Sequence, residues 1–303
     1  MAKENTHIFF AHTILEHFRG TELLKYISEY IDYYYLGCVI PDTFFYNTSM
    51  EVISETLHGK NGRPTNEIIF KVLERCADMR DTAFIMGYIT HCALDITFHP
   101  IAYYLSGNYY DPDPIQKRRA VYLHRYIETC MDMYLENPLK IYSMVRPYLV
   151  RSLQFEQIIC DEFSVSPADI RRALRKQLLS NRLFASNAAY WLARFIQRYG
   201  KTDMYEYLGL FYSHVAAQGN CIPEVISYRD IVSGAEKTTT INEVMTAAKD
   251  KAVAMMAAAY EYSQGRISKE KVKEAIPGES LDTGRLNTTV NSIRYTASGM
   301  KSP

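Results

Sequence analysis

Apolar residues recur every three to four positions along most of the chain, which is the spacing of amphipathic helices. A first helix is expected to begin at a cap formed by Asn5 or Thr6 and to end at Gly20. Helical spacing continues, with interruptions, over residues of about 21–35, 65–78, 80–105, 115–136, 167–199, 202–217 and 240–263. The sequence contains no strand-rich region and no glycine-rich nucleotide-binding motif. The pattern therefore predicts an all-α protein.

Capping and breaking residues mark the ends of several of these helices. The run from Ser166 to Asp169 is typical of a helix start, and Thr240 has the same role before the last long helix. Residues 107–114 contain Gly, Asn, Asp and Pro, which predicts a loop. After Gly278 the sequence becomes polar and rich in Gly, Ser and Thr, which predicts a mobile tail.

Composition and charge narrow the class of protein. Lys plus Arg and Asp plus Glu both number 34 in 303 residues, so no net charge attracts the chain to nucleic acid or to an anionic membrane. This balance does not exclude a local basic patch. A content of 48 % hydrophobic and 22 % charged residues excludes a disordered chain. The longest apolar run, residues 252–260, is too short to span a membrane.

The N-terminus and the cysteines predict a cytoplasmic protein. The first seven residues carry two charges and lack the apolar stretch of a secretory signal. The cysteines form no C-x-x-C pair, so we expect buried thiols in a reducing compartment. They are Cys38, Cys76, Cys92, Cys130, Cys160 and Cys221.

Histidines are concentrated near the N-terminus, with seven of the eight in the first 124 residues. His91, Asp95 and His99 recur every four residues on one helix face, so His91 and Asp95 can bind the same ion. His99 lies about 12 Å along the axis from His91 and suits a neighbouring ion. His124 and Glu128 repeat this spacing on the next helix. Such ligands favour zinc, with manganese or iron as alternatives.

Three further candidates lie upstream, namely His7, Asp42 and His58. Together with the two helices they provide enough ligands for two or three ions. A di-iron carboxylate site is disfavoured, because only one Glu-x-x-His pair, Glu55 to His58, is suitably placed. His12, His17 and His214 are expected to be structural.

In this order the motifs resemble those of the zinc-dependent phospholipase C family. That family includes bacterial phospholipases C and the catalytic domain of glycosylphosphatidylinositol-specific phospholipase D, and zinc nucleases of single-stranded nucleic acid share its fold. The motifs lie between residues of about 5 and 135. They are Thr6-His7 with Ala11-His12, Gly37-Cys-Val-Ile-Pro41-Asp42-Thr-Phe-Phe-Tyr46, His58, Gly87-Tyr-Ile-Thr-His91 with Asp95 and His99, and His124 with Glu128.

The resemblance implies an all-α, phospholipase C/zinc nuclease-like bundle and a set of metal ligands. One zinc would be held by Asp42, His58, His91 and Asp95. A second would be held by His99, His124 and Glu128, and a third by His7 with Asp95 as a bridge. The chain lacks the N-terminal Trp that completes the third site in the family, and the amine exposed by removal of Met1 is a candidate substitute. Asp42 is also expected to orient or deprotonate the attacking water.

The resemblance further implies a zinc-dependent phosphodiester hydrolase of phospholipase C type, acting on a phospholipid or a small phosphodiester. Two alternatives remain, a single-strand nuclease-like phosphodiesterase and a non-catalytic metal-binding helical protein. Tyr109 and Tyr110, between the two ligand-bearing helices, are candidates for binding a choline-like headgroup or a base. Half-buried packing is the competing interpretation of these tyrosines.

Three parts of the chain are distinguished. Residues 1–140 would form the zinc-binding catalytic helices, and residues 141–265 a C-terminal helical part packed on them. Residues 266–303 would form the polar, mobile tail.

Overall fold

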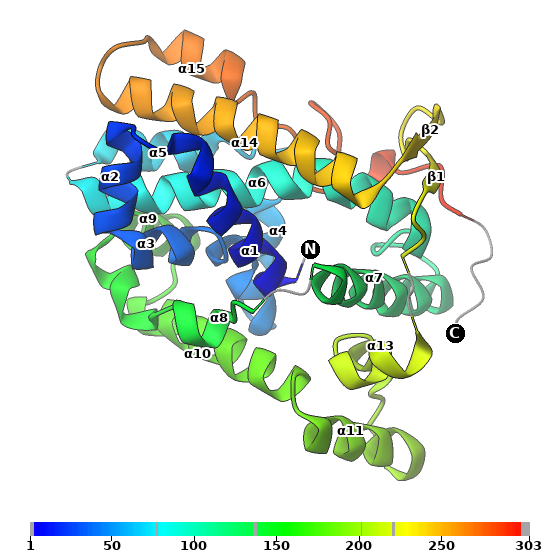
Figure 1. The fold of residues 1–303 in the computed structure, drawn as a ribbon. Helices are drawn as coiled ribbons and strands as arrows, with labels where there is room; N and C mark the ends of the chain where they lie inside the picture. The colour runs from blue at the N-terminus through cyan, green and yellow to red at the C-terminus, as the bar shows by residue number, and fades with distance from the viewer. Residues whose placement is uncertain (1–2, 77, 136–137, 201, 220–221, 298–303) are drawn as a thin grey trace.

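The computed structural model describes residues 3–76, 78–135, 138–200, 202–219 and 222–297. Helices dominate the fold (Figure 1), which confirms the predicted all-α class. The α-helices are α1 (Glu4–Ile14), α2 (Glu22–Glu29), α3 (Ile31–Gly37), α4 (Glu51–Leu57), α5 (Glu67–Arg75), α6 (Met79–Ser106), α7 (Pro114–Tyr134), α8 (Ile141–Met144), α9 (Gln154–Phe163), α10 (Pro167–Phe184), α11 (Asn187–Tyr199), α12 (Tyr205–Leu208), α13 (Tyr212–Gln218), α14 (Ile241–Ser263) and α15 (Lys269–Ala275). Short 3-10 helices are η1 (Leu15–Phe18), η2 (Ile40–Tyr46), η3 (Pro147–Ser152) and η4 (Val290–Ser292).

Helix α6 runs through the middle of the molecule, between α14 and the helices near the N-terminus (Figure 1). It is buried along most of its length because it packs against α1, α3, α7 and α14. Gly37 in α3 and Gly87 in α6 let two backbones touch, since a Cβ at Gly87 would collide with the carbonyl oxygen of Tyr34. A Cβ at Gly37 would collide in the same way with the carbonyl oxygen of Phe84. This close approach positions the metal-binding part of α6.

One large apolar core unites the chain, and it extends from Ile8 in α1 to Leu281 after α15. A second, small cluster contains Tyr190, Ala193 and Phe211 and connects α11 to its neighbours. Helix α11 is therefore attached to its neighbours α10, α12 and α13 through a small apolar cluster of its own.

Several helix boundaries differ from the sequence prediction. The predicted helix over 167–199 is two helices, because the chain breaks at Ala185 and the side chain of Ser186 caps α11. The segment of about 21–35 is likewise divided into α2 and α3. The capping signals at Ser166 and Thr240 are confirmed, and both form complete capping boxes.

The predicted cap of the first helix is wrong. Lys3 occupies the cap position of α1, without a side-chain hydrogen bond. Thr6 and Asn5 lie inside the helix and donate hydrogen bonds to the Asp132 carboxylate of α7, at 3.0 and 3.2 Å. Buried tertiary partners therefore take the place of the local capping bond.

A short antiparallel hairpin lies where no strand was predicted. Strands β1 (Ile226–Arg229) and β2 (Glu236–Thr239) pair with Ile226 opposite Thr239. Asp230, at the end of β1, accepts hydrogen bonds from the backbone N–H groups of Val232 and Ser233 and from the guanidinium of Arg285. Strands of four residues are too short for their alternation to be recognised.

The segment expected as a mobile tail is folded against the core over its described part. It contains α15, and Leu281, Asp282 and Thr283 are at most 4 % exposed. The prediction of a mobile tail rested on polar composition, but polar side chains of this segment form hydrogen bonds inside the protein. An example is the hydrogen bond that the Tyr103 hydroxyl donates to Asp282. Residues 298–303 lie outside the described residues. The boundaries at 140 and 265 stay predictions.

Two further expectations concern cysteines and membranes. Cys38, Cys76, Cys92 and Cys160 are free, as expected, although Cys76 and Cys160 are only partly buried. The prediction is wrong for Cys130, which is disulfide-bonded. Which cysteines pair cannot be deduced from the sequence alone, and scattered cysteines form no recognisable framework. Cys221 lies outside the described residues. Within the described residues, no helix combines the length and apolar character needed to cross a bilayer.

Candidate metal centre

The eight predicted ligands converge from five segments of the chain. His7 lies on α1, Asp42 on η2, and His58 directly after α4. Helix α6 contributes three of the remaining residues and α7 contributes two. All eight side chains are buried, with exposures of 5 % or less; they are His7, Asp42, His58, His91, Asp95, His99, His124 and Glu128.

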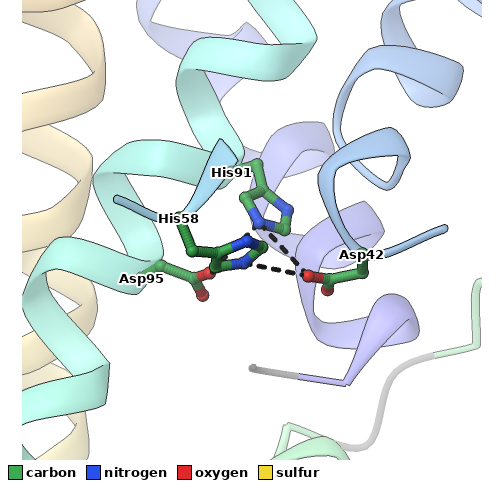
Figure 2. Close-up of side chains that lie close together, drawn as sticks. All are labelled: Asp42, His58, His91 and Asp95. Carbon is green, nitrogen blue, oxygen red and sulfur yellow. Dashed lines mark ion pairs between the residues drawn. The ribbon is translucent and has the colours of Figure 1, made fainter. Parts of the chain in front are cut away.

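The structure arranges seven of these residues in two groups. Asp42, His58, His91 and Asp95 each offer a ligand atom, and these atoms all lie within 4.8 Å of one another (Figure 2). The same limit holds for the group His99, His124 and Glu128. These are the two sets that the family resemblance implies.

Short distances hold the first group together. The Nε2 atom of His58 lies 3.1 Å from Oδ1 of Asp42, and that of His91 lies 3.1 Å from Oδ2 of Asp95. The crossed distances are 3.6 Å from His91 to Asp42 and 3.4 Å from His58 to Asp95. Each imidazole therefore faces both carboxylates, as one shared cation requires.

Asp95 belongs to the first group, but its carboxylate also faces the second group. Its Oδ2 atom faces His58 and His91, whereas its Oδ1 atom lies 3.4 Å from Nε2 of His99. Within the second group, Nε2 of His124 is 3.1 Å from Oε1 of Glu128. Asp95 is therefore placed to contact cations on either side.

His7 approaches the same carboxylate from α1. Its Nε2 atom lies 3.4 Å from Oδ1 of Asp95 and 3.8 Å from Oδ2 of Asp42. Its ring stacks on that of His91, with centroids 3.9 Å apart. A third ion at His7 stays a prediction, and Met1 and Ala2, which would provide the substitute amine, lie outside the described residues.

Hydrogen bonds at Nδ1 orient three of the imidazoles. The Nδ1 atoms of His58, His91 and His99 lie 2.7, 3.0 and 2.8 Å from backbone carbonyl oxygens, those of Ser54, Cys38 and Leu281 respectively. A carbonyl oxygen can only accept, so Nδ1 carries a proton and Nε2 is the atom that faces the centre. Such bonds to the outer nitrogen are typical of metal-binding histidines.

Unsatisfied polar atoms indicate what the centre can hold. The Nε2 atoms of His58, His91 and His99 and all four carboxylate oxygens of Asp42 and Asp95 are buried without a hydrogen-bond partner. Buried polar atoms are nearly always partnered in folded proteins. A divalent cation would satisfy these lone pairs together, so the donor set suits zinc.

The electrostatic environment favours ligand-competent protonation states. Burial lowers the pKa of His99 to about 3 and that of His124 well below its usual value, so both imidazoles are neutral at pH 7. Burial would raise the pKa of Asp42, but the imidazoles of His91 and His58 lower it overall. Burial would also raise the pKa of Asp95, but its histidine neighbours lower that pKa well below its usual range. Both carboxylates are therefore ionised.

His58 differs from His99 and His124 in the direction of its pKa shift. Burial lowers the pKa of His58, but its close contacts with the carboxylates of Asp42 and Asp95 raise that pKa to about 10 overall. The imidazole therefore holds a proton more tightly than a free histidine does. Because a metal ligand must present a free lone pair, cation binding would release that proton.

A cavity of about 260 Å³ opens next to both groups. His58, His124 and Glu128 contribute to its lining, and Tyr109 and Tyr110 form part of its wall. The Tyr109 ring lies 5.5 Å from that of His124. The structure therefore places the two predicted substrate-binding tyrosines beside the second group.

Asp282 also lines the cavity, and sequence reasoning missed it. Its Oδ1 atom accepts a hydrogen bond of 2.9 Å from the hydroxyl of Tyr103, whereas Oδ2 is buried without a hydrogen-bond partner. Burial raises the pKa of this carboxyl. Asp282 occurs in a polar segment without helical periodicity, so no sequence signal marked it.

Glu4 and Lys3 also line the cavity and were also missed. Glu4 accepts a hydrogen bond of 3.2 Å from the side chain of Gln177. The Lys3 ammonium donates to the carbonyl oxygen of Leu210 at 2.6 Å. They precede the first ligand and repeat no ligand spacing, so only the folded chain reveals their position.

The three histidines expected to be structural lie outside the two groups. His12 bonds to the Tyr35 hydroxyl at 2.7 Å, and His17 is exposed on η1. His214, for which the sequence indicated no partner, lies 2.8 Å from the Tyr122 hydroxyl.

The fold and the site define an all-α protein with buried histidine–carboxylate groups able to bind metal ions. The sequence model of the family described as zinc-dependent phospholipase C matches residues 6–209, and the chain belongs to that family. No curated protein and no solved structure matches the chain. The match ends before the segment that contributes Leu281 and Asp282.

Proposed function

We propose that this protein is a zinc-dependent phosphodiester hydrolase of phospholipase C type, acting on a phospholipid or a small phosphodiester. The observation that carries the proposal is the pair of histidine–carboxylate groups on either side of Asp95, next to a cavity with aromatic walls. Membership of the zinc-dependent phospholipase C family supports the same chemistry.

The proposed ligands follow the two groups. Asp42, His58, His91 and Asp95 would hold one zinc ion, and His99, His124 and Glu128 a second. His7 is proposed as a ligand of a third ion, with Asp95 as the bridge. Bound zinc ions would stabilise charge on the phosphoryl oxygens and make water a stronger nucleophile near neutral pH.

Asp42 is the proposed catalytic residue. It lines the cavity, and its carboxylate is ionised because neighbouring imidazoles lower its pKa. An ionised carboxylate accepts hydrogen bonds only, so it can orient a water molecule and receive its proton.

Tyr109 and Tyr110 are proposed to contact the group attached to the phosphate. Their rings lie 5.3 Å apart in a tilted arrangement beside His124. Aromatic faces attract quaternary ammonium groups, so a choline-like headgroup suits this wall. The guanidinium of Arg125 donates a hydrogen bond of 3.2 Å to the Tyr109 hydroxyl and holds that ring in place.

Elemental analysis tests the metal centre directly. We expect about two to three zinc ions per chain in the wild type and about one in Asp95→Asn, because this carboxylate faces both groups. Asp81→Asn is the matched control, since Asp81 is also buried, lies in the first turn of α6 and accepts a hydrogen bond from the backbone N–H of Gln154. One zinc or none, unchanged by Asp95→Asn, would contradict the proposal.

Activity is then measured on a short-chain phosphatidylcholine below its micelle concentration and on a single-stranded oligonucleotide. We expect hydrolysis of the phospholipid and a loss of about 10²–10⁴ in kcat for Asp42→Asn, which is the usual range for general acid–base groups. Zinc content measured on the same samples separates loss of the base from loss of a ligand. Cleavage of the oligonucleotide alone would instead favour a nuclease.

A further inference from the structure

Helix α11 directs large apolar side chains away from the core. Trp191, Leu192, Phe195 and Tyr199 are 64, 60, 61 and 66 % exposed. Their spacing places them on one face of the helix. The opposite face contributes Tyr190 and Ala193 to the small second cluster. Helix α11 therefore packs against its neighbours with one face and exposes large apolar side chains on the opposite face.

Two more large apolar side chains are exposed in the C-terminal half of α10, the helix that precedes α11 and contacts it: Leu179 and Leu183 are 59 and 46 % exposed. Six of the fourteen large apolar side chains exposed in the described residues thus lie between 179 and 199. Single exposed apolar residues are normal, but a concentrated group marks an interaction surface. We call these six side chains, with Arg194 and Arg198, the docking face.

Charge indicates the chemistry of the partner. Between residues 170 and 199 the sequence contains seven Lys or Arg and no Asp or Glu, although the whole chain is neutral. Two of the seven, Arg171 and Arg172, form ion pairs with Glu156 and Asp169, and the other five include both arginines of α11. The guanidinium of Arg194 lies 5.9 Å from the Trp191 ring, and that of Arg198 lies 5.3 Å from the Tyr199 ring. Among the described residues, no carboxylate forms an ion pair with either arginine.

Apolar and basic side chains on one helix match the surface of an anionic bilayer. Trp, Phe and Leu enter the boundary between headgroups and acyl chains, while Arg remains among the anionic headgroups. A purely apolar contact with a second copy of this chain would bring the arginines of both copies together. The charge distribution therefore favours lipid.

The helices that support α11 also contribute to the wall of the cavity. Ser180 and Phe184 on α10 and Tyr207 on α12 line the cavity, and α11 packs against both of these helices. Figure 1 shows α11 at the lower edge of the molecule, beyond α10 and α13. A surface bound by α11 would thus lie close to the cavity wall.

We propose that the docking face binds the surface of an anionic phospholipid bilayer and presents the cavity to its headgroups. This inference rests on the phospholipase C-like function proposed above, which provides the reason for a membrane at this position. Binding itself is measurable without catalysis.

The single tryptophan of the chain, Trp191, reports binding directly. Zinc-loaded wild-type protein is mixed with vesicles of phosphatidylcholine and phosphatidylserine, and with vesicles of phosphatidylcholine alone. We expect a blue shift of Trp191 emission and sedimentation with the mixed vesicles, and weaker binding to phosphatidylcholine alone.

Variants on α11 locate the contact. Phe195→Ser and Leu192→Ser should each weaken vesicle binding by about tenfold, because each removes one large apolar side chain from the lipid. Arg194→Gln and Arg198→Gln should each weaken binding to the mixed vesicles about fivefold and leave binding to phosphatidylcholine vesicles unchanged. Tyr148→Ser is the control, since Tyr148 on η3 is 63 % exposed outside the docking face and its loss should leave binding unchanged.

Several outcomes would overturn the docking face. They are the absence of any vesicle-dependent shift, equal loss of binding in Tyr148→Ser, and a concentration-dependent blue shift without lipid, which would indicate self-association.

Hydrolysis of a monomeric short-chain phosphatidylcholine separates the two proposals. If α11 variants retain this activity but lose activity on vesicles, the docking face is supported. If vesicles bind through α11 and no phosphodiester is cleaved, the docking face stands and the proposed function fails.

Discussion

The carboxylate of Asp95 illustrates how much depends on one side chain at this centre. Its two oxygens face different groups of imidazoles, and both are buried without a hydrogen bond. An uncompensated carboxylate at this depth would be strongly unfavourable. The Nε2 atoms of His91 and His99 lie within 3.4 Å of its oxygens, and a bound cation would compensate its charge more completely.

At the residue scale, Asp282 provides a test of the segment after α15. Asp282→Ala removes the acceptor of the Tyr103 hydroxyl and should lower the free energy of unfolding by about 1–3 kcal/mol, because a buried donor is left unpaired. Asp282→Asn retains a carbonyl acceptor and should be affected less. Urea denaturation measures both variants. Equal stability of all three proteins would show that this hydrogen bond contributes nothing.

Ligand-type residues were the most predictable part of the site. The spacing of His91, Asp95 and His99 follows from helix geometry, so their shared face could be inferred from the sequence. Asp282 could not be inferred, because its position depends on a long-range contact with Tyr103.

At the scale of elements, α3 and α6 depend on a pair of glycines. Gly87→Ala should destabilise the protein by about 3 kcal/mol, since the added Cβ collides with the Tyr34 backbone and the helices must separate. Separation would also move the Cys38 carbonyl away from His91, so zinc should bind more weakly. Thermal unfolding and a zinc titration measure the two effects.

Gly20→Ala is the control for this substitution. Gly20 has φ near +82° and no atom within 4 Å of an added Cβ, so only backbone strain of about 1 kcal/mol is expected. If both variants lost the same stability, close helix contact at Gly87 would not be the cause.

The β1–β2 hairpin allows a second prediction at the scale of elements, which concerns the pH dependence of stability. Burial would raise the pKa of Asp230, but hydrogen bonds from Arg285 and Ser233 lower it below its usual range. The folded protein therefore holds this carboxylate ionised to lower pH than the unfolded chain, whose pKa is about 3.9. The ionised Asp230 carboxylate therefore stabilises the folded protein fully above the unfolded pKa. This stabilisation is lost as the pH falls from the unfolded pKa towards the lower pKa of the folded protein.

Asp230→Asn tests this dependence. We expect the variant to be less stable than the wild type by about 1–3 kcal/mol at pH 7, with a smaller difference below pH of about 4. Urea denaturation of both proteins at several pH values measures the difference, and subtraction removes the groups that the two proteins share. A difference independent of pH would exclude the ionised carboxylate as its source.

At the scale of the whole molecule, cation binding and folding should be linked. Ligands come from α1, η2, α6 and α7 and from the turn after α4, so one cluster connects segments far apart in the sequence. Chelation should lower the melting temperature, and added zinc should restore it. A free zinc concentration of about a thousand times the Kd would raise the free energy of unfolding by about 4 kcal/mol.

Circular dichroism with and without chelator measures this effect. Asp95→Asn should show a smaller zinc-dependent shift, whereas Asp81→Asn should resemble the wild type. A melting temperature that does not respond to chelation would mean that the buried carboxylates are compensated by the protein alone.

The sequence by itself determined the helical class, the capping boxes at Ser166 and Thr240, and the residues able to bind metal. These follow from local chemistry, since helix geometry sets which side chains share a face. Only the tertiary structure decided that the Leu281 carbonyl supports His99, that Asp282 enters the cavity, and that the apolar face of α11 is exposed. A periodic pattern shows that a helix has an apolar face, but packing of distant segments decides whether that face is covered.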